Sequence, residues 1–170
     1  MNSTPPSASA DRGRRGGLRH DPVYDGWMGE ALDLAARAIE TGDVPIGALV
    51  VSTDGTVLGR GWNVREAHHD PTGHAEMVAL REAAGALGRW RLDGCTLVVT
   101  LEPCPMCAGA ASLARVERIV LGAWDPKAGA CGSVWDLVRD RAALHRVEVV
   151  GGVREAECAA LLPAFFAERR

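Results

Sequence analysis

The chain has 170 residues, which is the length of a single domain with room for its own hydrophobic core. Its 47% hydrophobic and 24% charged residues exclude a wholly disordered chain, a collagen-like repeat and a disulfide-rich miniprotein. No apolar run approaches the roughly 18–20 residues of a transmembrane helix, and the N-terminus lacks the apolar core of a secretory signal. We therefore expect no membrane association and no export.

The net charge of −3 is unevenly distributed along the chain. The first twenty residues hold four arginines against Asp11 and carry +3, so the remainder carries −6. An acidic domain weakly opposes nonspecific binding to nucleic acid, which depends on neutralising phosphates. Residues 1–22 are rich in Ser, Pro, Gly and Arg, and we expect a disordered tail there, followed by one domain over residues 23–170. The tail either has no role or attracts RNA.

Helical spacing of apolar residues and short β-branched runs predict the elements of this domain. In chain order they are a helix at 24–39, strands at 46–52 and 56–62, a helix at 73–84, a strand at 96–100, a helix at 104–113, strands at 118–121 and 147–150, and a helix at 155–168. The Asp54-Gly55 pair predicts a hairpin between the first two strands. This order favours a three-layer α/β/α fold with a mixed five-stranded sheet and an N-terminal antiparallel hairpin.

Two short motifs lie at predicted helix starts. The first is H-A-E at residues 74–76, and the second is P-C-P-M-C at residues 103–107. The start of a helix carries partial positive charge, which stabilises thiolates in its first turn. Residues three apart share a helix face, so Cys104 and Cys107 can point at one position.

Two thiolates and one imidazole make three zinc ligands. Catalytic zinc sites have three protein ligands and a water, whereas structural sites have four. Glu76 lies two residues from His74 and can take a proton from the water and pass it to a substrate nitrogen. The candidates for a fourth ligand are Cys95, Cys131, Cys158, His68, His69 and His145.

Each motif alone is weak. An isolated H-x-E is usually a surface accident, and an isolated C-x-x-C is equally typical of a redox pair, a structural zinc half-site or core cysteines. The two together, each opening a helix, match the pattern of zinc deaminases that act on nucleobases, where the glutamate is the acid and base and not a ligand. Closely spaced cysteines in a chain without an export signal indicate a protein of the reducing cytoplasm.

On these residues the chain resembles the cytidine/deoxycytidylate deaminase superfamily and, more narrowly, its tRNA adenosine deaminase branch. The branch is indicated by T-L-E-P-C-x-M-C-A-G-A at residues 100–110, D-P-K at 125–127 and F-F-x-x-R-R at 165–170. The resemblance implies a cytidine-deaminase-like fold in which His74, Cys104 and Cys107 bind one Zn²⁺ per subunit. It also implies that Glu76 transfers the proton.

The same resemblance implies the reaction and the partners. The reaction is hydrolytic deamination of adenosine to inosine at wobble position 34 of a tRNA anticodon loop, with water activated by zinc. The enzyme would be a homodimer joined through the helix at 107–113 and the strand and loop that follow. The residues that would contact RNA are Asn63, Asp125, Lys127, Phe166, Arg169 and Arg170.

Other functions stay open on the sequence. A deaminase of free nucleobases or nucleosides, such as cytosine or guanine, would use the same zinc chemistry and differ only around the pocket. A noncatalytic zinc-binding partner is opposed by Glu76, because a structural zinc has no use for that carboxylate. The chain departs from the usual branch pattern at Trp124 and Leu144, beside expected RNA contacts.

Overall fold

The computed structural model describes residues 21–167, so residues 1–20 of the predicted tail and the residues Arg169 and Arg170 lie outside the described part. The last two residues of the predicted tail belong to the first helix instead, with Asp21 as its N-cap and Pro22 as its first residue. Among the helices in this range, none has the length and apolar character needed to cross a bilayer. The elements follow the predicted order, with ends shifted by a few residues. They are α1 (Pro22–Glu40), β1 (Gly47–Val51), β2 (Val57–Trp62), α2 (Ala75–Leu87), β3 (Thr96–Leu101), α3 (Pro105–Leu113), β4 (Arg118–Ala123), β5 (Glu148–Val150) and α4 (Glu155–Ala167).

The strands form one mixed five-stranded sheet in the order β2-β1-β3-β4-β5. β1 pairs antiparallel with both β2 and β3, whereas β3–β4 and β4–β5 are parallel pairs. The predicted N-terminal hairpin and mixed sheet are therefore confirmed. β2 and β3 run in the same direction, as a strand–helix–strand unit requires, but β1 lies between them.

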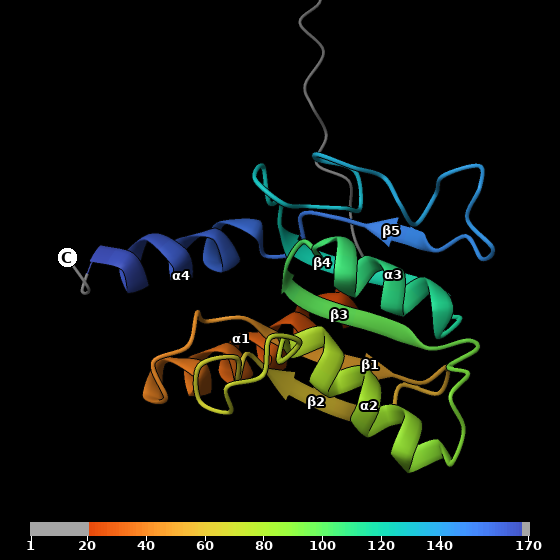
Figure 1. The fold of residues 1–170 in the computed structure, drawn as a ribbon, viewed down its shortest axis with the longest axis horizontal. Coiled ribbons are helices and arrows are strands. Elements are labelled where there is room, and N and C mark those ends of the chain that lie inside the picture. The colour runs from red at the N-terminus through yellow and green to blue at the C-terminus, as the bar shows by residue number, and fades with distance from the viewer. Residues whose placement is uncertain (1–20, 168–170) are drawn as a thin grey trace, which may run out of the picture.

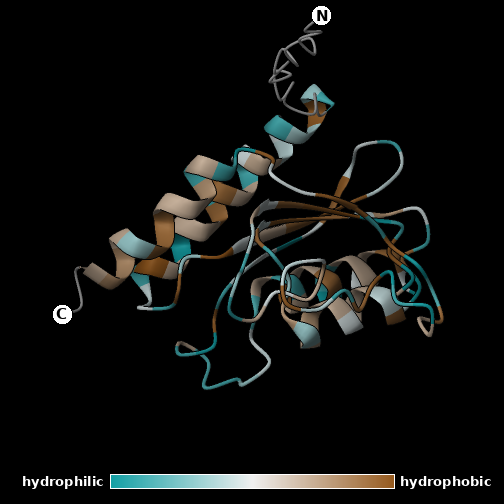
Figure 2. Ribbon diagram, turned by 90° about the horizontal axis from the view of Figure 1, so that it is seen from above, coloured by the Kyte–Doolittle hydropathy of each residue, from teal (hydrophilic) through white to brown (hydrophobic). Residues whose placement is uncertain are grey.

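The helices cover both faces of the sheet, as the pattern predicted (Figures 1 and 2). One core lies beneath α2 and α3, and a second lies beneath α1 and α4. Side chains alternate between them along each strand: in β3, Leu97 and Val99 face the first core and Val98 faces the second. Since α2 and α3 share one face, their N-terminal ends can meet at one edge of the sheet.

A close backbone contact fixes the start of α2. A Cβ atom at Gly61 in β2 would lie 2.1 Å from the carbonyl oxygen of Ala75, so only glycine lets the helix come this near the strand. Ala75 is the first residue of α2 and is fully buried. The first turn of α2, which holds one of the two motifs, therefore rests directly on the sheet.

Candidate active site

The structure brings the imidazole and the two predicted thiol ligands together. Nδ1 of His74 lies 3.6 Å from Sγ of Cys104 and 3.6 Å from Sγ of Cys107. His74 is the N-cap residue of α2 and Cys104 is the N-cap residue of α3, so both helix starts point at one position. Pro105 at the first position of α3 suits that start, because proline lacks the N–H that would have no partner there.

The spacing of these atoms fits zinc. A tetrahedral zinc with Zn–N of about 2.0–2.1 Å and Zn–S of about 2.3 Å separates a nitrogen ligand from a sulfur ligand by about 3.6 Å. The three ligand atoms lie within 4.8 Å of one another, and no other histidine, cysteine or carboxylate among residues 21–167 joins this group. The residues considered as a fourth ligand therefore lie outside it: Cys95, Cys131, Cys158, His68, His69 and His145. Three ligands leave one coordination position for water.

The electrostatics of the thiols suit a cation. Hydrogen bonding with Cys107, followed by hydrogen bonding with His74, lowers the pKa of Cys104 to about 4. The hydrogen bond to Cys104, followed by burial, raises the pKa of Cys107. A bound divalent cation deprotonates a coordinating thiol outright, so it would hold both sulfurs as thiolates.

Glu76 lies in the first turn of α2 and is only 3% exposed. It lines a cavity of about 160 Å³ together with His74 and Cys104. Burial raises the pKa of its carboxyl group. A raised pKa makes a carboxylate a better proton acceptor, which suits a general acid and base.

The residues expected to contact RNA surround this cavity unequally. Asp125 lines the same cavity as His74 and Cys104, which with Cys107 form what we call the metal-binding group. Lys127 and Phe166 line an adjoining cavity of about 260 Å³, which shares Leu101 and Asp125 with the first. Phe166 also lines a third cavity of about 430 Å³, which Asn63 lines as well. The structure thus distributes these side chains over three neighbouring hollows.

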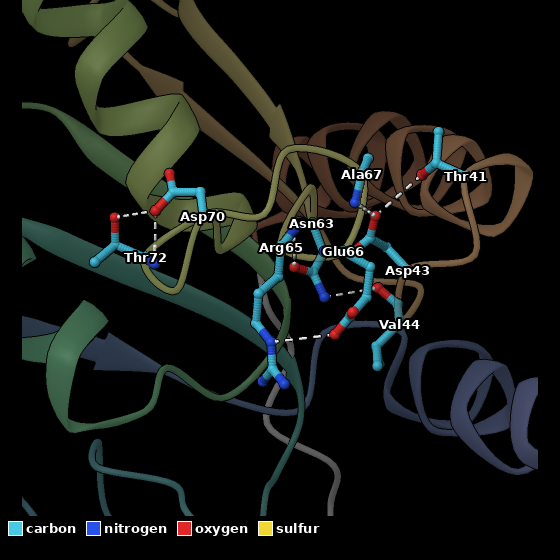
Figure 3. A network of polar contacts seen from close by, with 9 residues as sticks. All are labelled: Thr41, Asp43, Val44, Asn63, Arg65, Glu66, Ala67, Asp70 and Thr72. Atoms are coloured by element: carbon cyan, nitrogen blue, oxygen red, sulfur yellow. Dashed lines mark hydrogen bonds and ion pairs between the residues drawn. The ribbon is translucent and has the colours of Figure 1, made fainter.

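The side chain of Asn63 is already engaged with the backbone (Figure 3). Its Nδ2 donates to the carbonyl of Val44 at 3.3 Å, and its Oδ1 accepts from the N–H of Arg65 at 3.3 Å. An amide has two N–H donors and two acceptor lone pairs, so one of each is left for a ligand. The residue is 6% exposed, and its side chain joins the turn after β2 to the segment before β1.

The adjacent phenylalanines of α4 have different environments. Phe165 is 6% exposed and packs into the protein, whereas Phe166 is 53% exposed. Their rings meet edge to face with centroids 5.4 Å apart. Burial separates them: Phe166, which the resemblance places among the RNA contacts, is the ring that a ligand can reach.

Two buried carboxylates near the site were missed at the sequence level. Asp43 follows the end of α1 and accepts hydrogen bonds from the N–H groups of Glu66 and Ala67 and from the hydroxyl of Thr41 (Figure 3). Glu102 is 2% exposed and accepts hydrogen bonds from the loop after β4. The signal that could have revealed Glu102 is an acidic residue placed directly after a buried strand.

Comparison with known proteins agrees with this geometry. Residues 23–123 match the model of the family described as the cytidine and deoxycytidylate deaminase zinc-binding region. The chain is 51% identical over 153 residues to the tRNA-specific adenosine deaminase of Bacillus subtilis, covering 90% of this chain and 92% of that protein.

Two solved structures share the fold. One, from a study of A-to-I editing by tRNA:A34 deaminases at the wobble position of transfer RNA, has a TM-score of 0.77 and 44% identity over 81% of this chain and 99% of its own. The other, a guanine deaminase from Nitrosomonas europaea, has a TM-score of 0.71 and 27% identity over 84% of each chain. The chain therefore belongs to the cytidine and deoxycytidylate deaminase family and, within it, groups with the tRNA-specific adenosine deaminases.

Proposed function

We propose that this protein is a zinc-dependent hydrolase that converts adenosine to inosine at wobble position 34 of a tRNA anticodon. The observation that carries the proposal is the meeting of His74, Cys104 and Cys107 in one group, with Glu76 buried in the adjoining cavity. The similarity to the Bacillus subtilis tRNA-specific adenosine deaminase selects the substrate within this chemistry.

His74, Cys104 and Cys107 would hold the zinc. A zinc ion in such a site makes water far more acidic than bulk water, whose pKa is about 15.7, and so supplies a nucleophile at neutral pH. Glu76 takes a proton from the attacking water and delivers it to N1 of the adenine ring. It then takes the remaining proton from the hydroxyl group now bonded to C6 and donates it to the departing amino group. Overall, the water oxygen bonds to C6, the C6–N6 bond breaks, and adenosine and water become inosine and ammonia.

Four residues form what we call the mouth of the site: Asn63, Asp125, Lys127 and Phe166. Single-stranded RNA loops are bound by stacking unpaired bases on aromatic rings and by contacts to base edges and phosphates. These contacts would come from the exposed ring of Phe166, the side-chain amide of Asn63 and the cation of Lys127. Arg65 also lines the cavity beside Asn63, together with Asp43 and Glu66.

The substrate assignment is tested with an anticodon stem-loop that has adenosine at position 34, beside a matched stem-loop in which the adenosine stands at position 35. Inosine is measured by nucleoside mass spectrometry after digestion. The proposal expects inosine from the first RNA alone. Activity confined to free cytosine, adenosine or guanine, or no deamination of any substrate, would overturn it.

Deamination of free nucleobases is the second candidate, because the guanine deaminase shares the fold and the same chemistry could serve a smaller substrate. Two observations disfavour it. The identity is 27% to that enzyme and 44% to the tRNA:A34 deaminase structure. The cavity lined by Asn63 and Phe166, of about 430 Å³, is also larger than the cavity of about 160 Å³ beside His74 and Cys104, as expected for a substrate that extends past the reacting base.

We also propose that the enzyme is a homodimer. Leu113, at the end of α3, is 66% exposed, and Leu144 is 82% exposed. The two lie on adjoining segments, because the hydroxyl of Ser112 donates to the carbonyl of His145 at 2.9 Å. A second copy would cover this apolar patch. Sedimentation analysis should give twice the chain mass, and Leu113→Glu should shift it to the monomer; a monomeric wild-type protein would contradict the proposal.

The cytoplasm is the compartment that we propose. Two of the five cysteines must stay reduced to act as zinc ligands, and the chain forms no disulfide that would call for an oxidising environment. The tRNA substrate is also found there. Thiol titration of protein purified from cells without added reductant should find the cysteines unoxidised.

A further inference from the structure

Three carboxylates are buried among the described residues: Asp43, Glu76 and Glu102. Glu76 belongs to the metal-binding end of the site, but Glu102 has no part in the proton transfers. A buried carboxylate is costly unless hydrogen bonds compensate for the lost hydration. The groups that donate hydrogen bonds to Glu102 therefore indicate its role.

Four hydrogen bonds reach the Glu102 carboxylate from the loop after β4. Oε1 accepts from the N–H groups of Cys131 at 2.9 Å and Ser133 at 3.1 Å. Oε2 accepts from the N–H of Asp125 at 3.0 Å and from the hydroxyl of Ser133. One side chain thus joins the first and the last part of residues 125–133, which we call the β4 loop.

The backbone on either side of Glu102 makes further bonds to the same region. The N–H of Glu102 donates to the carbonyl of Ala123 at 2.8 Å, and the N–H of Ala130 donates to the carbonyl of Pro103 at 2.8 Å. Cys104, a zinc ligand, follows directly. The segment that presents Cys104 and the loop that presents Asp125 are therefore held to each other.

The path of the β4 loop is shaped around this carboxylate. A Cβ atom at Gly129 would lie 2.1 Å from Oε2 of Glu102, so a larger residue there would displace either the loop or the carboxylate. The N–H of Gly129 donates to the carbonyl of Asp125 at 3.0 Å, which closes the turn that contains Lys127. Close packing and hydrogen bonding thus act on the same stretch of backbone.

We propose that Glu102 is a positioning residue that fixes the β4 loop as a wall of the active site and so sets the affinity for RNA. It lines the same cavity as His74, Glu76 and Cys104 but lies outside the group that could hold the metal, and it acts through Asp125 and Lys127. This inference rests on the proposed function, because RNA is the substrate that the loop would contact. A carboxylate is required, since a glutamine would turn an NH₂ group toward N–H donors on one side.

The experiment compares Glu102→Gln with Glu82→Gln. Glu82 is a matched control because its carboxylate also accepts a backbone N–H, that of Arg60 at 2.7 Å, on a surface away from the site. Three quantities are measured: zinc per chain, hydrogen exchange of the amides of Asp125, Cys131 and Ser133, and kcat and KM with the stem-loop that has adenosine at position 34.

Glu102→Gln should keep one zinc per chain while the three amides exchange at least tenfold faster. KM should rise at least tenfold and kcat should fall less than threefold, because the loop binds substrate outside the reacting atoms. Glu82→Gln should match the wild type. Unchanged amide exchange, an unchanged KM, loss of zinc, or a fall in kcat alone would each overturn the proposal.

Two further measurements cover the cases in which Glu102→Gln does not fold or the wild-type protein does not deaminate RNA. If Glu102→Gln does not fold, Ser133→Ala removes one of the four donors and leaves the carboxylate; a rise in KM of about threefold supports the proposal and no rise overturns it. If wild-type protein makes no inosine from RNA, the proposed function fails. Amide exchange in the variants then still decides whether Glu102 holds the loop, and unchanged exchange overturns that claim by itself.

Discussion

The metal-binding end of the site and its mouth are built from different parts of the chain. At the metal-binding end, His74, Glu76, Cys104 and Cys107 lie at the starts of two helices that pack on the same face of the sheet. At the mouth, loops and the end of α4 present the side chains, and two buried carboxylates hold those loops by their backbone N–H groups. In the proposed enzyme, catalysis would thus depend on regular structure, and RNA recognition would depend on loops whose side chains can vary without moving the metal ligands.

Removing a zinc ligand should have the largest effect. Cys107→Ala takes away a fully buried sulfur of the three-membered group, so zinc should fall from one per chain toward none and deamination should fall to background. Metal analysis of the purified protein measures this. Cys158→Ala, a buried cysteine outside the group, is the control and should keep both; zinc retained in Cys107→Ala would show that the site is misassigned.

Glu76→Gln comes next. The amide keeps the size of the side chain and removes its capacity to transfer protons, so kcat should fall by about 10²–10⁴-fold. Zinc should stay at one per chain, because Glu76 is not a ligand. Steady-state kinetics and metal analysis on the same preparation separate the two quantities. Full activity would refute the proton-transfer role, and loss of zinc would mean that the carboxylate supports the metal instead.

The support beneath the metal-binding end can be tested at Gly61. Gly61→Ala places a Cβ against the carbonyl oxygen of Ala75, and such overpacking typically costs about 1–3 kcal/mol. The free energy of unfolding, measured in urea, should fall by that amount, and activity should fall with it because α2 carries two site residues. Gly85→Ala is the control, since a Cβ there meets nothing within 4 Å. Equal stability of both variants would contradict the close contact.

Substitutions at the mouth of the site should have the smallest effects on stability and activity. Phe166→Ala removes an exposed ring, so stability should change by less than about 0.5 kcal/mol. Stacking of one base on an aromatic ring is worth about 1–3 kcal/mol, so affinity for the stem-loop should fall roughly tenfold. Fluorescence anisotropy with labelled RNA measures this. Trp90→Ala, an exposed ring that lines none of the three cavities described, should bind normally; equal losses in both variants would argue against a specific stacking site.

The same contrast explains what the sequence could predict. Helical periodicity and short β-branched runs located every element of residues 21–167 to within a few residues, because strands that pack on two cores form continuous apolar runs. The metal-binding group was predictable because its ligands are read from motifs at helix starts. The roles of Glu102 and Asp43 were not, because they depend on backbone N–H groups brought close by loops, and such donors carry no sequence signature. Burial likewise separated Phe165 from Phe166, which the periodicity could not do.

X-ray absorption at the zinc edge of the purified wild-type protein tests the central claim most directly. The account predicts one zinc per chain with two sulfur ligands at about 2.3 Å and two nitrogen or oxygen ligands at about 2.0–2.1 Å, of which one is His74 and the other is water. A shell with three or four sulfurs, or protein without zinc, would mean that the site is closed or has another purpose, and the hydrolytic assignment would then be wrong.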